Sequence, residues 1–431
     1  MNNKLKTILA HIGGADPDKP LPTFDELPHY KNFPGCAWEV WGKDDQLGTV
    51  NLLTDAVVKR AASEEIRTGR AVSLNWPLNF PDQPLFGRRA PHIESFFSHP
   101  GLGHARDEEI HMNSQSSTQW DGVKHFPLLE HGVIYGGISA EGLPAGHFPM
   151  PDPLKVDPEL IKMGIHNWAS HGICGRGVFL DLVRFFTKGG KPLPYDPWST
   201  HPISVADLEA CAREEGVTFR RGDILILRVG FIQKYMTSTA KEKDDLVGRP
   251  PMLAGIEQSD AMKRFLWNNH FAAIASDQPA LESWPPAEGV KYMHEVCTLL
   301  WGMPLGEFFD VETLSSVCAE NGRYTFFFSS WPLNILGGTA SPPNAAVSAH
   351  PLCVSFVGIW ILIPPRCAGR RTSEPMEHSL GSFDGKGRHA VNTPSETVGL
   401  CTRTSGGLPC IYYAQMQRPA QRVTDYAMYI A

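Results

Sequence analysis

The sequence lacks the cysteine spacing of disulfide-rich or thiolate-zinc proteins and the charge of nucleic-acid-binding proteins. Its nine cysteines are an odd number and include no Cys-x-x-Cys pair. This usage predicts free, mostly buried thiols in a reducing compartment. The formal net charge is -7, and lysine and arginine form no long cluster. Because phosphate groups are bound by clustered cations, nucleic acid and anionic membranes are not expected partners.

The sequence also lacks a membrane-spanning run and several familiar catalytic motifs. Its longest apolar stretch, residues 351–365, is too short and broken to span a bilayer comfortably, and the N-terminal residues contain no signal-like apolar stretch. There is no Gly-x-Ser-x-Gly elbow, Walker loop or full GxGxxG motif. His294-Glu295 lacks the second histidine of a zinc helix. We therefore expect a cytoplasmic protein whose main partner is a small molecule.

Helix and strand signals alternate through most of the chain. Helices are predicted at residues 54–69, 157–170, 204–215 and 259–268, with Thr54 and Ser204 as N-caps. Apolar or alternating runs predict strands at residues 71–78, 177–184, 223–229, 271–276 and 324–330. Residues 79–117 read as a long loop. This alternation predicts a mixed α/β fold.

Composition divides the chain into three parts. Residues 1–37 contain many Pro, Asp and Lys residues in their first 34 positions and are predicted to form an extended arm. Residues 38–346 carry the strand and helix pattern and are predicted to be the catalytic domain. Residues 347–431 lose that pattern and contain four of the nine cysteines. This tail is either a variable or disordered segment or a gene-model artefact, and no function is assigned to it.

A polar run at residues 115–125 carries the strongest functional signal. Metal-capable side chains recur at Gln115, Gln119, Asp121 and His125. In an extended segment, residues 119 and 121 point to the same side, so several oxygens and one imidazole could surround a single point. From spacing alone, an ordinary polar loop is the favoured interpretation.

This run resembles the signature of the cyclase / kynurenine formamidase family, His-x-Gly-Thr-His-x-Asp-x-Pro-x-His. Thr118, Asp121 and His125 occupy matching positions, whereas Gln115 and Gln119 stand where the family has two metal-binding histidines. Ser117 replaces the motif's glycine and Val123 its proline. Segments with further resemblance cover roughly residues 38–346 and include WGKDDQLGTVNLLT, GRGVFLDL and RRGDILILRVGF.

The resemblance implies a swivelling β/β/α fold with a mixed sheet and flanking helices, usually in a homo-oligomer. It also implies a divalent metal, manganese or zinc, and hydrolysis of formyl-kynurenine, isatin or similar compounds. Carried over by position, the metal ligands are Asp121, His294 and Glu307, with Gln115 and Gln119 as neutral substitutes. His125 is the implied general base, and Asp121 acts beside it.

The two glutamines change the expected chemistry. A site with fewer nitrogen ligands favours harder ions such as Mn²⁺ or Mg²⁺ over Zn²⁺, or holds no metal. If an ion binds, it activates water and polarises the carbonyl, and His125 transfers the proton. Three neighbouring residues are candidate substrate contacts: Trp120 between the presumed ligands, His111 upstream in the loop, and Asp277 after a predicted strand. Trp120 could equally be a core aromatic. The alternative for Asp277 is that it caps a turn and does not contact substrate.

Three functions remain open at this point. The first is a metal-dependent hydrolase of a small cyclic or N-acyl amide, resembling arylformamidases, or of a lactone. The second is a cyclase or dehydratase of specialised metabolism that uses His125 for acid–base chemistry without metal. The third is a ligand-binding homologue without catalysis. The substrate itself cannot be predicted, because pocket side chains lie on loops that no motif fixes.

Overall fold

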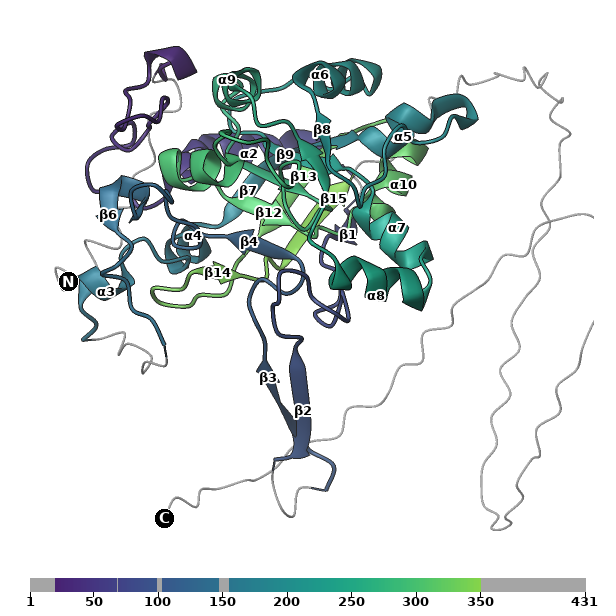
Figure 1. The fold of residues 1–431 in the computed structure, drawn as a ribbon, viewed down its shortest axis with the longest axis horizontal. Coiled ribbons are helices and arrows are strands. Elements are labelled where there is room, and N and C mark those ends of the chain that lie inside the picture. Colours follow the sequence, from purple (N-terminus) through teal and green to yellow (C-terminus); the bar gives the residue numbers. More distant parts are fainter. Residues whose placement is uncertain (1–19, 68, 99–102, 147–154, 350–431) are drawn as a thin grey trace, which may run out of the picture. The chain divides into compact units, whose positions relative to one another are not determined.

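The structure is a computed structural model that describes residues 20–67, 69–98, 103–146 and 155–349. Within these residues the chain forms a mixed sheet of nine strands with helices on both faces (Figure 1). The strand order is β1-β15-β13-β7-β9-β11-β12-β4-β14. The strands are β1 (Arg70–Ser73), β15 (Ala345–Ala349), β13 (Thr325–Ser330), β7 (Ile173–Asp181), β9 (Ile224–Arg228), β11 (Ala273–Ser276), β12 (Leu305–Glu307), β4 (Gln119–Asp121) and β14 (Ala340–Ser341).

Parallel pairs occupy the centre of this sheet and antiparallel pairs its two sides. β7, β9, β11 and β12 run parallel to one another. β13, β15 and β1 continue the sheet antiparallel on one side, and β4 and β14 do so on the other. Three two-stranded ladders lie outside it: β2 (His92–Phe97) with β3 (Arg106–His111), β5 (Val133–Ile134) with β6 (Ile138–Ser139), and β8 (His201–Ile203) with β10 (Ala254–Ile256).

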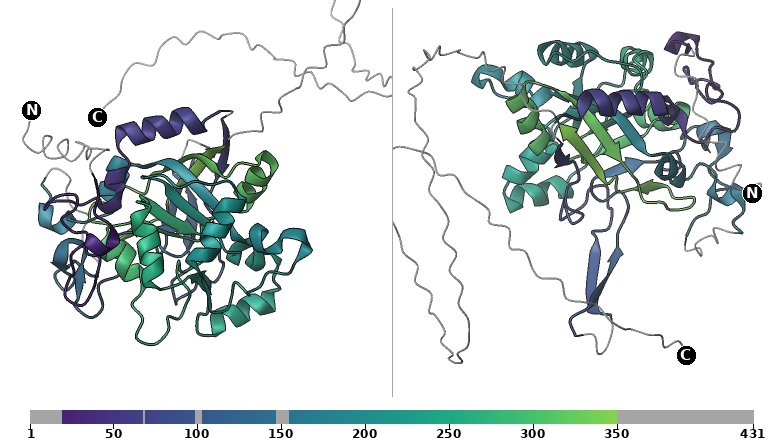
Figure 2. Two further views of the ribbon diagram at one scale, coloured as in Figure 1. Left: turned by 90° about the horizontal axis from the view of Figure 1, so that it is seen from above. Right: turned by 180° about the vertical axis from the view of Figure 1, so that it is seen from behind.

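Helices cover both faces of the sheet. The purple helix α2 crosses one face, whereas α6 and α9 lie over the opposite face (Figure 2). The α-helices are α2 (Asp55–Glu65), α3 (Pro158–Ile161), α4 (His166–His171), α5 (Leu182–Thr187), α6 (Val205–Glu214), α7 (Phe231–Thr237), α8 (Ala240–Gly248), α9 (Asp260–Asn268) and α10 (Glu312–Asn321). Shorter turns of helix are η1 (Phe24–Glu26), η2 (Gly48–Leu52), η3 (Tyr135–Gly137), η4 (Lys188–Gly190) and the π-helix η5 (Glu295–Leu300).

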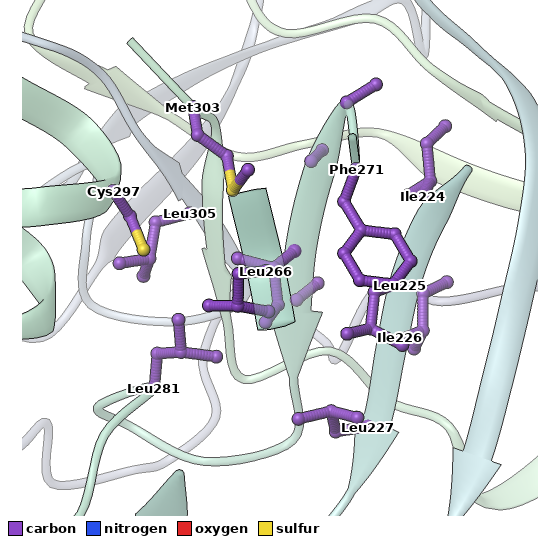
Figure 3. Close-up of a cluster of buried hydrophobic side chains, with 14 of the residues drawn as sticks. Ile224, Leu225, Ile226, Leu227, Leu266, Phe271, Leu281, Cys297, Met303 and Leu305 are labelled. Atoms are coloured by element: carbon purple, nitrogen blue, oxygen red, sulfur yellow. The ribbon is translucent and has the colours of Figure 1, made fainter. Parts of the chain in front are cut away.

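The central strands are buried on both faces, which explains their unbroken apolar sequences. Every residue of β9 and β11 is buried, as expected for parallel strands covered by helices on both sides. Figure 3 shows Leu225, Phe271 and Leu305 among the side chains of this core, and Leu266 of α9 lies beside them. The sheet therefore provides a rigid base for residues at its ends.

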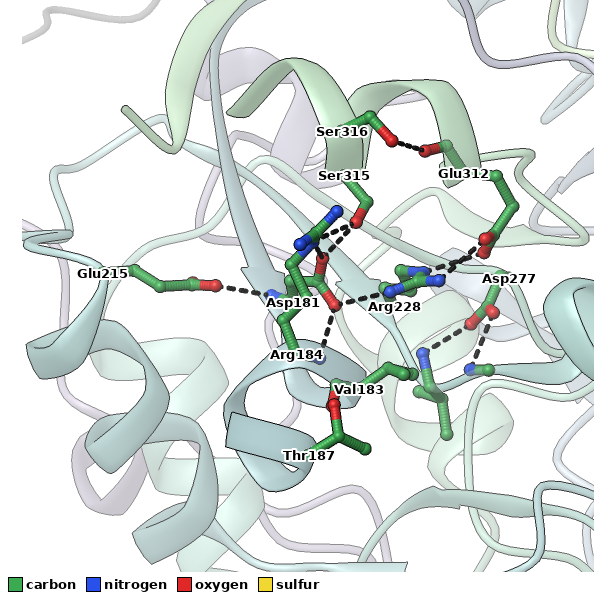
Figure 4. A network of polar contacts seen from close by, with 12 residues as sticks. Asp181, Val183, Arg184, Thr187, Glu215, Arg228, Asp277, Glu312, Ser315 and Ser316 are labelled. Carbon is green, nitrogen blue, oxygen red and sulfur yellow. Dashed lines mark hydrogen bonds and ion pairs between the residues drawn. The ribbon is translucent and has the colours of Figure 1, made fainter. Parts of the chain in front are cut away.

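A second kind of buried contact is ionic (Figure 4). Arg228 of β9 pairs with Asp181 of β7 at 3.0 Å and with Glu312 of α10 at 2.7 Å. Asp181 also accepts hydrogen bonds from the Arg184 backbone and the Ser315 hydroxyl. We call Asp181, Arg228, Glu312, Arg184 and Ser315 the balanced cluster, because each of its carboxylates has a cationic partner.

The two predicted N-caps are confirmed. The Thr54 hydroxyl accepts a hydrogen bond from the Val57 backbone at the start of α2. Ser204 forms a reciprocal capping box with Asp207 at the start of α6. In both cases a short polar side chain satisfies backbone donors that have no partner within the helix.

Two predicted elements differ from the structure. The helix predicted at 157–170 is divided into α3 and α4, because Met163 takes a left-handed conformation with φ of 58° between them. The loop predicted at 79–117 contains the hairpin β2–β3, which projects from the sheet (Figure 1). All residues of both hairpin strands are exposed. Because neither strand faces a core, the usual alternation of apolar and polar residues is missing from their sequence.

Both predicted domain boundaries also need correction where the structure describes them. Residues 24–37 are not an extended arm: Phe24, Phe33 and Ala37 are buried in the main core, and Gly35 accepts a hydrogen bond from Trp301. At the other end, residue 346 lies inside β15, which pairs with both β1 and β13. Residues 1–19 and 350–431, including most of the predicted tail, lie outside the described residues.

Two further expectations concern the described residues. None of the helices in this part of the chain is long and apolar enough to cross a membrane. The cysteines that the structure describes are free thiols: Cys36, Cys174, Cys211, Cys297 and Cys318. The four cysteines of the predicted tail lie outside these residues.

Candidate functional site

The polar run singled out in the sequence enters the sheet as β4, beside β12. Their antiparallel register places Gln119 opposite Glu307 and Asp121 opposite Leu305. Since side chains alternate along a strand, Gln119 and Asp121 share one face with Glu307. Strand geometry alone therefore gathers an amide and two carboxylates at one point.

Trp120 lies on the other face of β4 and anchors the strand in the core. Its ring contacts Phe309 and Phe328 at centroid distances of 4.9 and 6.3 Å, and its indole donates to the Ser330 hydroxyl. Gly306 is opposite Trp120, and a Cβ atom there would lie only 2.8 Å from the Trp120 ring. The absence of a side chain at Gly306 lets the indole fill this space, which fixes the position of β4.

The fourth side chain comes from the π-helix η5. His294 immediately precedes this helix, and π-helical turns are frequent at functional sites. The His294 Nδ1 atom lies 2.6 Å from Glu282, which is completely buried. This contact turns the other ring nitrogen, Nε2, towards Glu307 at 3.1 Å and Asp121 at 3.6 Å.

These side chains form one compact group, which we call the acidic cluster: Asp121, Glu282, His294 and Glu307. One ligand-type atom from each of Asp121, His294 and Glu307 lies within 4.8 Å of the other two. The amide nitrogens of Gln115 and Gln119 lie 2.8 and 3.3 Å from Asp121 Oδ1, and that of Gln119 lies 2.6 Å from Glu307. His125 Nε2 lies 3.8 Å from Asp121 Oδ2.

One oxygen of the acidic cluster and one oxygen of the neighbouring Gln119 have no hydrogen-bond partner among the described residues. They are Asp121 Oδ2 and Gln119 Oε1, and both are buried. An unpaired buried oxygen normally costs about 1–3 kcal/mol, and more when it is charged. Such atoms are rare in folded proteins, and a bound water or ion or a role in catalysis accounts for many of them.

The charges of the cluster shift its ionisation equilibria strongly. Burial alone would raise the pKa of Asp121, but His125 and His294, with a smaller contribution from Arg88, lower it to about 2. Burial lowers the pKa of His125, and Asp121 only partly opposes this effect. Near neutral pH, Asp121 is therefore a carboxylate and His125 a neutral imidazole that can accept a proton.

Glu307 and His294 shift in the opposite direction. Burial, followed by the charge of Asp121, raises the pKa of Glu307 to about 7. Burial lowers the pKa of His294, but Glu282, Asp121 and Glu307 outweigh it and raise the value well above the ordinary range. Protons thus supply the positive charge that this group of carboxylates requires.

Comparison with known proteins agrees with this geometry. A family model described as "Putative cyclase" matches residues 24–283, more than half of the chain. The chain belongs to this cyclase family. A crystal structure of a novel cyclase is 28% identical, with a TM-score of 0.61, and the match covers 72% of this chain and 99% of that chain. The predicted family and fold class are thereby confirmed.

More distant structures match over similar lengths. Isatin hydrolase A from Labrenzia aggregata, bound to benzyl benzoate, is 15% identical with a TM-score of 0.43, covering 68% of this chain and 97% of that chain. A potential metal-dependent hydrolase with cyclase activity is 12% identical with a TM-score of 0.35, and the match covers 64% of this chain and 98% of that chain. A search of curated proteins found no significant match.

Most of the residues carried over from the cyclase-family signature come together. Gln115, Gln119, Asp121, His294 and Glu307 meet in one buried place, and His125 lies at its edge with 21% of its side chain exposed. Thr118 has a supporting position instead, because its hydroxyl donates to the Phe308 carbonyl and accepts from the Trp76 backbone.

The three expected substrate contacts do not join this group. Trp120 is fully buried on the opposite face of β4, which contradicts a substrate-binding role. Asp277 is also fully buried, and its two oxygens accept hydrogen bonds from the Val229 and Gly230 backbones. It therefore caps the turn between β9 and α7. His111 is exposed at the end of β3 and lies 3.7 Å from Glu109. It is not among the residues that meet at Asp121, but it lines a cavity at the base of the β2–β3 hairpin.

The donor set fits a divalent cation. Three carboxylates and one imidazole are buried together, and a positive ion would offset their repulsion. The Glu282 contact at His294 Nδ1 is the carboxylate–histidine arrangement that orients metal-binding imidazoles. Asp121 Oδ2 and Gln119 Oε1 are two buried acceptors without partners. Asp121, His294 and Glu307 would hold such an ion.

Sequence reasoning missed two contributors. The first is Glu282, which holds His294 directly. The second is Arg88, which donates to the Gln115 carbonyl at 2.8 Å. Both lie far from residues 115–125 in sequence, so no spacing rule could connect them to the motif.

Proposed function

We propose that this member of the cyclase family is a metal-dependent hydrolase of a small cyclic or N-acyl amide, or of a lactone. One observation carries the proposal. Asp121, His294 and Glu307 converge in a buried site, within 4.8 Å of one another, beside a neutral imidazole. Attack of water on a carbonyl carbon requires an ion that activates the water and a nearby group that accepts its proton.

Each side chain has a distinct task in this proposal. Asp121, His294 and Glu307 hold the ion, and Glu282 orients His294 through its Nδ1 atom. A bound divalent ion supplies Lewis acidity, which polarises the substrate carbonyl and makes water more acidic. His125, whose pKa burial lowers, accepts the proton from water and returns it to the leaving nitrogen or oxygen.

The oxygen-rich donor set favours a hard ion. Gln119 offers an amide oxygen and Gln115 supports Asp121, where the cyclase-family signature has imidazoles. Since carboxylate and amide oxygens suit Mn²⁺ and Mg²⁺ better than Zn²⁺, we propose manganese or magnesium as the ion.

The decisive experiment is the metal content of the purified protein after dialysis against Mn²⁺ and against Zn²⁺. We expect about one ion per chain in the wild type and none in Asp121→Ala, because the central ligand is removed. Asp245→Ala removes an exposed carboxylate on α8 and should keep the metal. Hydrolysis of N-formyl arylamines, isatin-like lactams and lactones should follow the metal content. A metal-free wild type after both dialyses would refute the proposal.

A second candidate is a metal-free cyclase or lyase, favoured by the amide groups of the glutamines. In the structure both amides donate N–H groups to the carboxylates, at 2.6–3.3 Å, so neutral donors partly replace an ion. His125 would then act as the acid–base group. Turnover that survives a chelator and is lost in His125→Asn would support this candidate, whereas a non-catalytic homologue would keep ligand binding in the same variant.

A further inference from the structure

A cavity lies at the base of the β2–β3 hairpin and is lined by residues that precede β2 and follow β3. Its volume is ≈ 880 Å³, against ≈ 400 Å³ for a second cavity lined by Glu65, Arg176 and Tyr324. Its wall includes Phe86, Arg88, Asn113 and His111, and His111 is a candidate substrate contact predicted from the sequence. Cavities of about 300–1,000 Å³ accommodate small organic ligands.

Gln115 connects this cavity to the acidic cluster. Arg88 donates to the Gln115 carbonyl at 2.8 Å, and the Asn113 side chain accepts from the Gln115 backbone at 2.9 Å. On its other side, Gln115 donates to Asp121 at 2.8 Å. Gln115 therefore links two residues of the cavity wall to Asp121, a candidate metal ligand.

In the described ranges Arg88 forms no ion pair within 4.0 Å, although its charge lowers the pKa values of Asp121 and Glu307. Its guanidinium lies over the Phe86 ring at 5.2 Å and uses one N–H group on the Gln115 carbonyl. By contrast, the buried Arg176 and Arg228 are each paired with carboxylates. Because a guanidinium carries five N–H donors, Arg88 has donors left for an anion in the cavity.

A row of aromatic rings leads from the cavity to the imidazole of the cluster. Phe86 contacts Trp284 at 6.2 Å, and Trp284 stacks on Tyr292 at 5.4 Å. Tyr292 contacts Phe126 at 5.7 Å, and Phe126 contacts His294 at 5.8 Å. Phe86 is exposed and the other three rings are half-buried, so part of each ring is available to a ligand ring.

We propose that Arg88 binds a carboxylate of the substrate and that the substrate is a small aromatic acid whose hydrolysable bond reaches the acidic cluster. This assignment rests on the proposed function, because it names the substrate class of the same site. A planar guanidinium binds carboxylates through two parallel hydrogen bonds. It also offsets the repulsion that Asp121 and Glu307 would exert on an anionic substrate.

The test uses two fluorescent probes of nearly the same shape, 2-aminobenzoate and its neutral counterpart 2-aminobenzamide. Their dissociation constants are measured by fluorescence titration, with and without a chelator. We expect the wild type to bind the carboxylate about tenfold or more tightly than the amide. Arg88→Gln should raise the carboxylate Kd about tenfold and leave the amide Kd within about twofold. Arg88→Lys should retain part of the preference, because it keeps the charge but not the planar fork.

Arg60→Gln is the matched control, since it removes one positive charge from the exposed side of α2 and should change neither Kd. Equal affinities in the wild type, an unchanged carboxylate Kd in Arg88→Gln, or no binding of either probe would overturn the assignment. Loss of carboxylate binding in the chelator would also overturn it, because the ion would then hold the anion. Selective, Arg88-dependent binding by a protein without metal or hydrolysis would support the assignment while refuting the proposed function.

Discussion

The protein contains two buried groups of charged side chains that differ in how their charges are compensated. In the balanced cluster, Arg228 lies between Asp181 and Glu312 with ion pairs of 3.0 and 2.7 Å (Figure 4). In the acidic cluster, Asp121, Glu282 and Glu307 share one imidazole, His294. Asp121 there keeps one oxygen without a hydrogen bond in the described part of the chain.

This difference separates a structural role from a functional one. A buried ion network with all partners present holds its elements in one arrangement, here β7, β9 and α10. A buried group with excess negative charge and unpaired acceptors is unfavourable by itself, and such groups concentrate at sites that bind ions or perform chemistry. The same residue types thus have opposite consequences, depending on whether the fold supplies a counter-charge.

The largest effect should come from breaking the balanced cluster. Arg228→Met removes the shared cation and leaves the buried Asp181 without its ion pair to β9. We expect the free energy of unfolding to fall by about 3 kcal/mol or more, measured by urea denaturation.

A surface pair provides the control for this variant. Arg213 and Glu209 are both well exposed and 3.8 Å apart, so Arg213→Met should cost less than about 1 kcal/mol. If the two variants lose equal stability, Arg228 does not have the structural role assigned to it here.

Removing a negative charge from the acidic cluster should raise the stability of the metal-free protein, whereas breaking the balanced cluster should lower it. Glu307→Gln removes one of three crowded carboxylates but keeps a hydrogen-bonding group opposite Gln119. We expect this variant to bind metal poorly, yet to be more stable than the wild type without metal by about 1 kcal/mol at pH 8. Thermal unfolding in a chelator measures this difference.

The pH dependence follows from the raised pKa of Glu307. Folded Glu307 holds its proton up to about pH 7, whereas an unfolded glutamate releases it near pH 4.5. Its contribution to stability is therefore complete below pH 4.5 and is lost as the pH rises through about 7. The advantage of Glu307→Gln in the metal-free state should accordingly grow between these values. An advantage that is constant from pH 5 to pH 8 would contradict the assigned ionisation.

The last prediction concerns Glu282, the residue behind the imidazole, and is measured as metal affinity and not as stability. Glu282→Gln retains an acceptor for His294 Nδ1 but removes the charge that orients and polarises the ring. We expect metal affinity to fall about 10- to 100-fold, measured by competition with a metal-sensitive dye. The exposed Glu288→Gln is the matched control. Unchanged affinity in Glu282→Gln would show that packing alone orients His294.

Much of the central sheet could be predicted because its sequence signals are local. The apolar runs that became β9 and β11 and the caps Thr54 and Ser204 depend on neighbours within a few residues. The hairpin β2–β3 was missed because its exposed strands carry no alternation. The ends of the catalytic domain were misplaced because Phe24 and Val347 obtain their burial from residues distant in sequence.

The candidate site was predictable in part for the same reason. The motif around Asp121 and His125 could be aligned with a family signature, and that alignment led to His294 and Glu307. Trp120 and Asp277 were assigned to substrate wrongly, because sequence proximity does not show which face of a strand or turn a side chain occupies. Both carboxylate oxygens of Asp277, for example, accept hydrogen bonds from backbone amides.

The sequence by itself determined the α/β class, the family and the identity of the candidate ligands, since these depend on local patterns and on residues at fixed spacing. The tertiary structure alone decided that Glu282 holds His294 and that Arg88 lies beside Gln115. It also decided that one group of charges is balanced and the other is not. The physical reason is that charge compensation depends on distances of a few ångströms between side chains, and only the folded chain sets those distances.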